Sequence, residues 1–201
     1  MRRLVAVRDL TPVAVLATHG HVDHTWDAAE LTSAFAVPFL IHTADVYRLV
    51  DPFGTLGAIG SSLDSGGPLA QALADVGADP GSYGAPDRVE PFGGPADANG
   101  RSADVLIELG GVRLLARHAP GHTEGSTIYL LDVEPPVALT GDVLFAGTVG
   151  RTDLPGGDSP VMSATLRDVV SALAPETLLL PGHGPSSHLE VELASNPYLH
   201  R

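Results

Sequence analysis

The most constraining feature of the chain is a group of four metal-capable side chains that begins where a buried strand ends. Residues 13–17 read VAVLA, and a continuous apolar run with β-branched members is typical of a buried strand. The residues that follow Thr18 include His19, His21, Asp23 and His24. Imidazole and carboxylate groups bind zinc and similar divalent ions. We therefore predict a strand that opens onto a metal site.

The four side chains of this group are spaced so that they could serve two metals. His19 and His21 are two residues apart, so on an extended chain their side chains point the same way. Asp23 and His24 are adjacent and must point differently. A solvated, histidine-rich loop is the alternative, and further metal-capable residues along the chain weigh against it.

Strand and helix patterns alternate along the rest of the chain, which favours an α/β fold with covered sheets. Ala28, Leu31 and Phe35 form a helical face, and Ser159-Pro160 opens a second helix whose buried face would contain Met162, Leu166, Val169, Val170 and Leu173. The predicted strands are residues 39–41, 105–109, 112–116, 126–131, 137–139 and 177–180. The strands at 105–109 and 112–116 flank Gly110-Gly111 and so predict a hairpin.

Residues 51–103 differ in character from the rest of the chain. They are rich in Gly, Pro, Ser and Asp, and they contain one short helical pattern, with Leu69, Leu73 and Val76, that stops at Gly77. We interpret this segment as a surface excursion within a single domain that spans residues 1–201. Whether the excursion covers a substrate or is only a mobile insertion stays open at this point.

Three further metal-capable residues follow predicted strands, and each stands beside glycine. They are His122 in PGHT, Asp142 in TGD and His183 in PGHG. Glycine at a strand end lets the backbone turn sharply, so the neighbouring side chain can face a cleft. Each of these residues alone is a weak signal, but together with the first group they supply five histidines and two aspartates. That set is enough for two metals with one bridging carboxylate.

The ordered motifs THGHVDH, PGHTEGS, TGDVLF and PGHGP resemble those of the metallo-β-lactamase superfamily. The segment FAGTVGRTDLPGGD, residues 145–158, and the terminal NPYL, residues 196–199, resemble the glyoxalase II-like hydrolases of that superfamily. The resemblance extends from about Thr11 to the C-terminus. It implies a four-layer αββα sandwich with the metals at one edge of its two sheets.

The resemblance also implies a ligand set and a chemistry. His19, His21 and His122 would hold one metal, Asp23, His24 and His183 would hold the other, and Asp142 would bridge them. Two divalent ions, zinc in the first place and iron or manganese as alternatives, can lower the pKa of a shared water toward neutrality. The resulting hydroxide would attack an acyl carbonyl, and Asp23 and Asp142 are the predicted catalytic residues that hold the metals in place.

These features favour a metal-dependent hydrolase of a thioester or related acyl compound. One alternative is a persulfide dioxygenase with a single iron, which would share the histidine motifs and the stretch Gly150-Arg151-Thr152-Asp153. The continuation Leu-Pro-Gly-Gly-Asp inclines us to the hydrolase. A second alternative, of a different class, is a truncated, non-catalytic metal-binding or interaction protein.

The composition of the chain limits the classes of partner that we expect it to bind. The net charge of −13 disfavours a nucleic-acid partner, because phosphate binding needs Lys and Arg to displace counterions. No apolar run approaches the roughly 20 residues that span a bilayer, so we expect no membrane partner. The chain has no cysteine, which excludes disulfides, thiolate ligands and a cysteine nucleophile. We expect a small-molecule substrate and a cytoplasmic location.

The chain departs from the family pattern at both ends. Only 18 residues precede His19, so we expect the family's first strands to be missing and residues 1–9 to be the end of a helix. An incomplete sheet edge could be covered by a second copy in a homo-oligomer. The chain also stops soon after His183, so we expect no C-terminal helical domain that binds glutathione.

Other conspicuous residues have less specific explanations. We predict a packing or supporting role for His118, a structural role for His42, and a packing role for Trp26 rather than a platform for substrate. Arg151 and Asp153 could pair and fix the loop after Asp142. Nothing in the pattern favours a functional role for His188 or His200.

Overall fold

The fold is built on a first sheet that carries the histidine-rich segment. The computed structural model describes residues 1–63, 66–98 and 100–200. Its first sheet has the order β1-β2-β3, formed by β1 (Val15–Leu16), β2 (Phe39–His42) and β3 (Val89–Phe92). All of its pairings are parallel, with Val15 opposite Phe39 and Phe39 opposite Val89. The strand predicted at 13–17 is therefore shorter than expected, and the strand predicted at 39–41 is confirmed.

Strand β3 lies inside the predicted excursion, where no strand was expected. Its sequence, Val-Glu-Pro-Phe, contains Pro91, which has no backbone N–H to donate to a sheet. Proline is tolerated here because β3 is the edge strand beside β2. The rest of the excursion carries the short helical elements η2 (Gly54–Leu56), α4 (Ala58–Ser61), α5 (Pro68–Asp75) and η3 (Pro80–Ser82). Helix α5 confirms the predicted helical pattern.

The second sheet contains the later strands in the order β11-β10-β7-β6-β5-β4. Its strands are β4 (Val105–Leu109), β5 (Val112–His118), β6 (Thr127–Leu131), β7 (Val137–Gly141), β10 (Leu178–Pro181) and β11 (Ser187–His188). Gly110 and Gly111 both have positive φ, 54° and 86°, and join β4 to β5 as the predicted two-residue hairpin. A small separate hairpin, β8 (Leu144–Phe145) with β9 (Thr148–Val149), follows β7.

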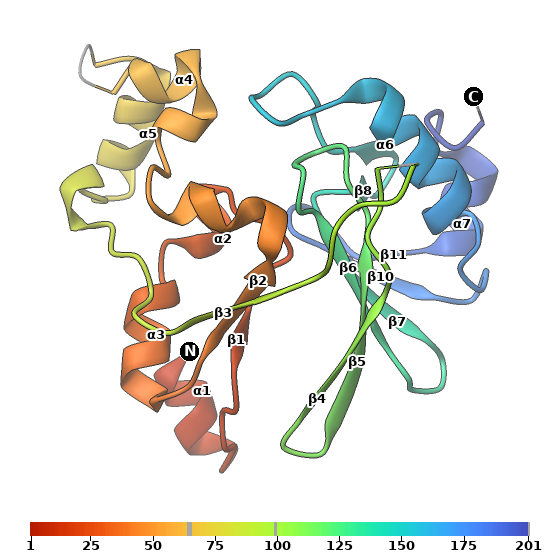
Figure 1. Cartoon of the computed structure of the whole chain (residues 1–201), viewed down its shortest axis with the longest axis horizontal. Coiled ribbons are helices and arrows are strands. Elements are labelled where there is room, and N and C mark those ends of the chain that lie inside the picture. Colours follow the sequence, from red (N-terminus) through yellow and green to blue (C-terminus); the bar gives the residue numbers. More distant parts are fainter. Residues whose placement is uncertain (64–65, 99, 201) are drawn as a thin grey trace.

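Helices cover the outer faces of both sheets and complete a four-layer sandwich, as Figure 1 shows. The elements on the first side are α1 (Arg2–Val7), α2 (Val22–Thr25), α3 (Ala28–Phe35) and the 3₁₀ helix η1 (Thr43–Leu49). Those on the second side are α6 (Ser159–Thr165), the π-helical turn η4 (Leu166–Val170) and α7 (Leu189–Ser195). Helix α6 begins as predicted, but its N-cap is Asp158, whose side chain accepts a hydrogen bond from the Val161 amide.

The hydrophobic core consists of separate clusters, because alternate side chains on a strand point to opposite faces of the sheet. On β2, Phe39 and Ile41 pack with Ala28 of α3, whereas Leu40 packs against Ile107 of the second sheet. A third cluster lies under α6 and η4 and contains all five residues of the predicted buried face. Each fully buried side chain of this size contributes about 1.5–3 kcal/mol.

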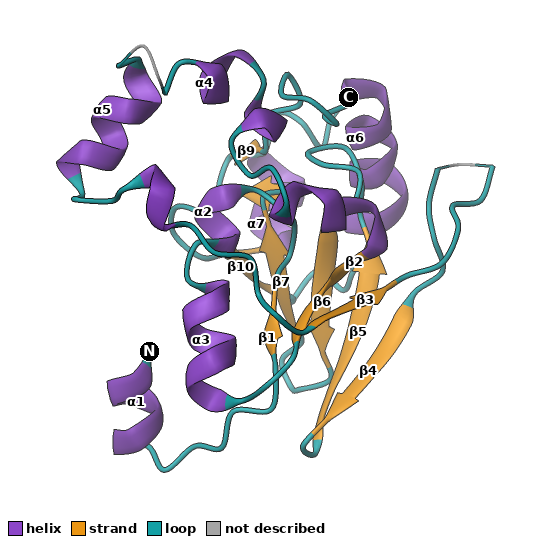
Figure 2. Ribbon diagram, turned by 60° about the vertical axis from the view of Figure 1, so that its left-hand side comes forward, coloured by secondary structure: helices purple, strands orange, loops and turns teal. Residues whose placement is uncertain are grey.

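The strand ends that carry the predicted ligands meet at one edge of the sandwich. Strands β5, β7 and β10 run in the same direction, because β6 is antiparallel to both β5 and β7 and β10 is parallel to β7. Their carboxyl ends therefore share an edge, beside the end of β1 near α2 (Figure 2). Within the described residues, no helix is both long enough and apolar enough to cross a membrane.

Candidate metal centre

The first motif changes from extended chain to helix within the predicted ligand set. His21 has extended backbone angles, φ −65° and ψ 149°, and is the N-cap of α2. Asp23 and His24 lie in the first turn of that helix, where Thr25 donates a hydrogen bond to the His21 carbonyl. The turn from strand to helix therefore places two ligand candidates before the helix and two on it.

The seven predicted ligands converge in three overlapping groups. Within each group, one potential ligand atom of each residue lies within 4.8 Å of the others. The groups are His19 with His21 and His122, His19 with His24 and Asp142, and Asp23 with His24 and His183. The first and third groups are the two terminal ligand sets that the resemblance implies.

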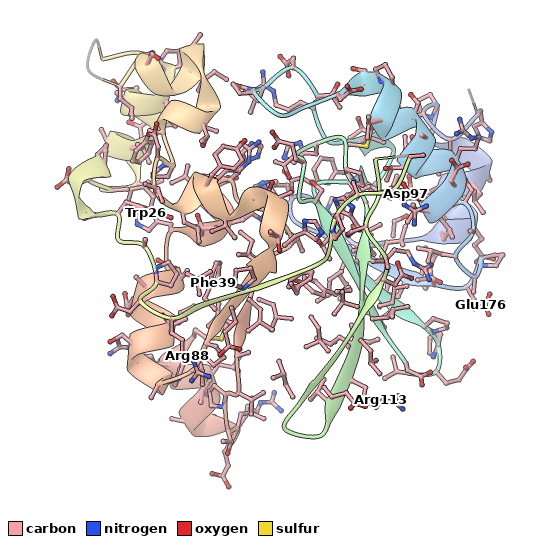
Figure 3. The ribbon with its side chains drawn as sticks, in the orientation of Figure 1. Trp26, Phe39, Arg88, Asp97, Arg113 and Glu176 are labelled. Carbon is pink, nitrogen blue, oxygen red and sulfur yellow. The ribbon has the colours of Figure 1, made fainter. Side chains whose placement is uncertain are left out.

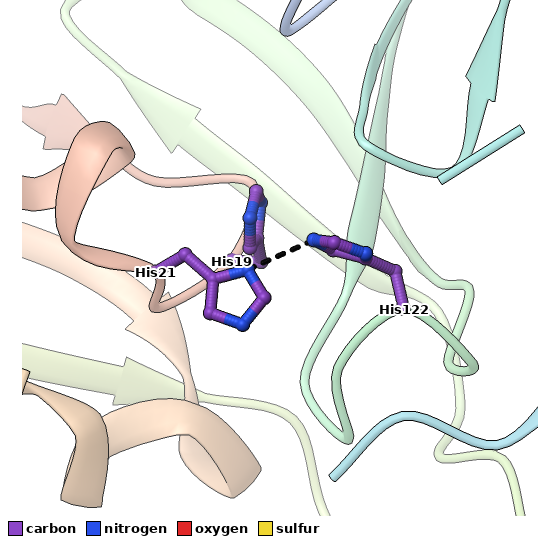
Figure 4. A group of neighbouring side chains, drawn as sticks. All are labelled: His19, His21 and His122. Atoms are coloured by element: carbon purple, nitrogen blue, oxygen red, sulfur yellow. Dashed lines mark hydrogen bonds between the residues drawn. The ribbon is translucent and has the colours of Figure 1, made fainter. Parts of the chain in front are cut away.

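The first group is fully buried, and its nitrogen atoms face one another. Nδ1 of His21 lies 2.9 Å from Nε2 of His122, and the His19 ring is 4.7 Å from the His122 ring (Figure 4). His21 and His122 come from opposite halves of the sandwich, so this group joins the two sheets.

The third group is more exposed and is completed by the last of the predicted ligands. Nε2 of His183 lies 3.1 Å from Nε2 of His24 and 3.1 Å from Oδ2 of Asp23. Asp142 stands between the first and third groups. Its carboxylate is 3.3 Å from His24, 3.5 Å from His183 and 3.7 Å from His122. This is the position that a bridging carboxylate would need.

Burial keeps the first group in the form that binds cations. Burial, with a smaller contribution from the neighbouring His122, lowers the pKa of His21 to about 3. Burial is also the main cause that lowers the pKa of His19 and of His122. Neutral imidazoles present a free lone pair, whereas imidazolium rings repel a cation.

The carboxylates of the site act on His24 in the opposite direction. Burial disfavours protonation of His24, but the hydrogen bond to Asp142 and the charge of Asp23 outweigh it and raise the His24 pKa. Burial likewise disfavours the charged form of Asp142, yet the bond from His24 and the neighbouring histidines lower its pKa. Asp142 is therefore held as a carboxylate, the form in which it can share its charge with a cation.

Several polar atoms at the centre lack a partner, which supports a fit to metal ions. His19 Nε2 and His21 Nε2 are buried, and neither has a hydrogen-bond partner within the described chain. The opposite nitrogen of His122, Nδ1, donates to the carbonyl of Arg151 at 2.7 Å, which leaves its Nε2 lone pair facing the centre. A donor set of five imidazoles and two carboxylates with unsatisfied inward atoms suits divalent cations.

His42 and His118 lie outside these groups and form a stacked pair, with ring centroids 4.1 Å apart and an angle of 8°. Backbone amides of Ala44 and Ser102 donate to their Nδ1 atoms, so each ring carries its proton on Nε2. His42 then donates to Ser102 Oγ and His118 donates to the Glu124 carbonyl. These contacts agree with the structural role predicted for His42 and the supporting role predicted for His118.

Trp26 and Arg151 both make the kind of contact expected for them. Trp26 lies beside α2 (Figure 3), and its ring meets those of Phe53 and Tyr83 at 6.1 Å, so it packs against two parts of the excursion. Arg151 pairs with Asp153 through bonds of 2.7 and 2.8 Å. His188 is exposed in β11.

A second set of polar residues beneath the centre was missed from the sequence. Asp45 and Arg48 in η1 are both fully buried and contact the loops that carry His19, His21 and His122. The only available signal was an acidic and a basic residue three apart in an otherwise apolar stretch. Because buried charges are rare unless paired, that spacing could have identified them.

A four-layer α/β sandwich with histidines and aspartates gathered at one sheet edge defines a class of metal-binding proteins. Residues 2–183 match the family described as the metallo-beta-lactamase superfamily. The chain belongs to this superfamily, whose members are mostly metal-dependent hydrolases.

Alignments with relatives of known sequence or structure include nearly the whole chain. The protein Rv2581c of Mycobacterium tuberculosis, described as uncharacterized, is 34% identical over 99% of this chain and 81% of its own length. Hydroxyacylglutathione hydrolase GloC of Haemophilus influenzae is 29% identical over 95% of this chain and 77% of its own. The crystal structure of TTHA1623, in a di-iron-bound form, superposes with a TM-score of 0.71 and 31% identity, and it covers 98% of this chain and 83% of that one.

Proposed function

We propose that the protein is a dinuclear metal-dependent hydrolase of a thioester or related acyl compound. The observation that most supports this proposal is the convergence of seven histidine and aspartate side chains into overlapping groups around Asp142. His19, His21 and His122 would hold one ion, and Asp23, His24 and His183 the other. Divalent ions at these positions would polarise an acyl carbonyl and lower the pKa of the attacking water.

The residues of the chain prepare the site for this chemistry. The Arg151 carbonyl fixes the orientation and tautomer of His122, and burial keeps His19 and His21 neutral. Asp142 is held as a carboxylate by His24 and would offset the positive charge of the ions. A thiolate leaving group needs little protonation, so a thioester could be cleaved at this site without a general acid.

A groove beside the centre supports a substrate-covering role for the excursion. Leu56 and Ile59 line one side of it, and the loop from Arg151 to Gly157 lines the other, enclosing about 530 Å³. The same loop holds His122 through the Arg151 carbonyl. We propose that the acyl or thiol part of the substrate lies along this groove. The relatedness to GloC supports a hydroxyacyl thioester as the first substrate to test.

The test combines metal content with turnover. Protein purified without added metal is analysed for metals per chain, beside His21→Ala and the exposed control His188→Ala. Each protein is then assayed with hydroxyacylglutathione, other thioesters and oxygen esters. We expect two ions per chain and thioester hydrolysis in the wild type and in His188→Ala. In His21→Ala we expect the metal content to be halved or lost and hydrolysis to be lost.

Three results would overturn the proposal. One iron per chain with oxygen uptake on a thiol persulfide would favour the dioxygenase. Absence of metal and of turnover would favour a non-catalytic binding protein. Two ions without hydrolysis of any thioester or ester would exclude the acyl substrate class.

A further inference from the structure

A buried ion pair lies directly beneath the candidate metal centre. Asp45 and Arg48 stand three residues apart on η1, and neither has exposed side-chain surface. Arg48 Nε lies 3.4 Å from Asp45 Oδ1. Burying two charges is costly unless each is paired and hydrogen-bonded, so the other contacts of this pair decide what it does.

The Asp45 carboxylate joins loops from the two halves of the sandwich. Its Oδ2 accepts from the Gly20 amide at 2.8 Å and from the Thr123 hydroxyl at 2.7 Å. Its Oδ1 accepts from the Gly125 amide at 2.8 Å. Gly20 lies between His19 and His21, and Thr123 directly follows His122. One side chain therefore holds both loops that supply the first ligand group.

Arg48 extends the same connection to a third loop. Its Nη2 pairs with Glu124 and donates to the Pro155 carbonyl at 2.9 Å. Pro155 belongs to the loop whose Arg151 carbonyl accepts from His122 Nδ1. The ion pair thus contacts both the loop that carries His122 and the loop whose carbonyl accepts from the His122 ring.

The loops lie so close to the ion pair that they leave no room for side chains at two glycines. A Cβ on Gly20 would come within 2.8 Å of Arg48 Cδ, and one on Gly125 would come within 2.6 Å of Asp45 Cγ. The backbone amides therefore reach the carboxylate directly, and their positions are fixed by it rather than by intervening side chains.

We propose that Asp45 is a positioning residue that sets the separation between His122 and the pair His19 and His21. This inference rests on the proposed dinuclear centre. Asp45 itself touches neither substrate nor metal, and it acts by holding Gly20 and Thr123 on one carboxylate. A ligand set held in place before binding loses less free energy on ordering, so loosening it weakens metal affinity.

The test measures zinc affinity for each ligand group separately. In a His183→Ala background only the first group is complete, and in a His122→Ala background only the second is. Zinc is titrated against a chromophoric chelator with and without Asp45→Asn. We expect Asp45→Asn to weaken binding about 10- to 100-fold in the first background and less than about 3-fold in the second.

A control separates positioning from general destabilisation. Val170→Ala removes buried volume in the core under α6, away from these loops, and lowers stability without altering the carboxylate. It is expected to leave both zinc affinities unchanged. Equal weakening by Asp45→Asn in the two backgrounds, or weakening no greater than that of Val170→Ala, would overturn the proposal.

If Asp45→Asn does not fold, a milder pair of variants tests the positioning role of Asp45. Thr123→Val removes the hydroxyl that donates to Asp45, whereas Thr123→Ser keeps it. We expect the first to weaken zinc binding in the His183→Ala background about 10-fold and the second to leave it unchanged. Unchanged binding in both would refute the positioning role. If the unsubstituted protein binds no zinc, the proposed function itself fails.

Discussion

At the scale of single residues, the metal-ligand candidates were predictable, but the groups that support them were not. All seven predicted ligands lie together, because histidines and aspartates after strand ends leave a clear pattern in the sequence. Asp45 belongs to no motif, and its contacts depend on η1 meeting a loop about 80 residues later in the chain. The ligand role of the seven residues and the supporting role of Asp45 remain predictions.

Gly150 offers a residue-scale test of the centre's tight packing. A Cβ at this position would collide with the Asp142 carbonyl oxygen and lie 3.1 Å from His122 Nδ1. We expect Gly150→Ala to displace one of these ligands and to weaken zinc binding at least 10-fold. Gly94→Ala is the control, since no atom lies within 4 Å of its added Cβ. Equal affinities in the two variants would contradict the arrangement.

The stacked His42 and His118 predict a dependence of stability on pH. Burial, with a smaller contribution from His118, lowers the His42 pKa from 6.5 to about 4 in the folded protein. The unfolded chain then binds more protons, so this contribution to stability is complete above pH 6.5 and is lost as the pH falls toward 4. By pH 5 the loss is about 2 kcal/mol.

The measurement compares urea unfolding at pH 8 and pH 5. We expect the stability difference between wild type and His42→Gln to shrink at pH 5 by about 2 kcal/mol, because the variant lacks the titrating ring. Ser102→Ala keeps both rings and loses only a hydrogen-bond partner, so its curve should stay parallel to that of the wild type. Parallel curves for His42→Gln would show that His42 is not held neutral.

At the scale of helices and strands, apolar patterns were sufficient for the central elements and failed at the edges. Apolar patterns predicted strands β2, β4, β5, β6, β7 and β10 and helices α3 and α6, and each lies close to its expected position. Strand β3 was missed because Pro91 and its glycine-rich surroundings hide an edge strand. The hairpin β8–β9 has two-residue strands, too short to leave a periodic pattern.

Helix α7 explains why the short hairpin after Asp142 is ordered. Asn196, fully buried at the end of this helix, donates toward the carbonyls of Phe145 and Thr148 at 3.4 and 3.2 Å. Glu192 on the same helix accepts from the Gly147 amide at 2.8 Å. The last helix therefore fixes the segment that directly follows a predicted ligand.

Removing that contact should destabilise the protein measurably. We expect Asn196→Ala to lower the free energy of unfolding by about 1–3 kcal/mol, because it removes a buried amide that donates to the buried Glu192 carboxylate and to the hairpin carbonyls. Ser195→Ala, on the exposed side of the same helix, should change it by less than about 0.5 kcal/mol. Chemical unfolding followed by circular dichroism gives both values. Similar values for the two variants would argue against the hairpin contact.

At the scale of the whole molecule, the predicted four-layer sandwich is confirmed, and the site lies where its two halves meet. Four ligand candidates belong to the first half and three to the second. Because the ligands come from both halves, a bound ion would link the two sheets and would bind the folded chain in preference to the unfolded one.

Metal removal is therefore expected to lower thermal stability. At an excess of a thousandfold over its Kd, each ion contributes about 4 kcal/mol, which corresponds to a rise in Tm of roughly 10 °C for a chain of this size. Calorimetry of the chelated and zinc-loaded protein measures the shift. His21→Ala should show a smaller rise and His188→Ala the full one. A Tm that does not change with saturating zinc would contradict the link between the halves.

The division of the ligands between the halves also has a consequence during synthesis. Ribosomes make the chain from its N-terminus, so His19, His21, Asp23 and His24 emerge well before His122 and His183. The first ligand group becomes complete when His122 has been made, and the second only after His183. A nascent chain therefore passes through a stage at which the residues of the first group have all been made and those of the second have not.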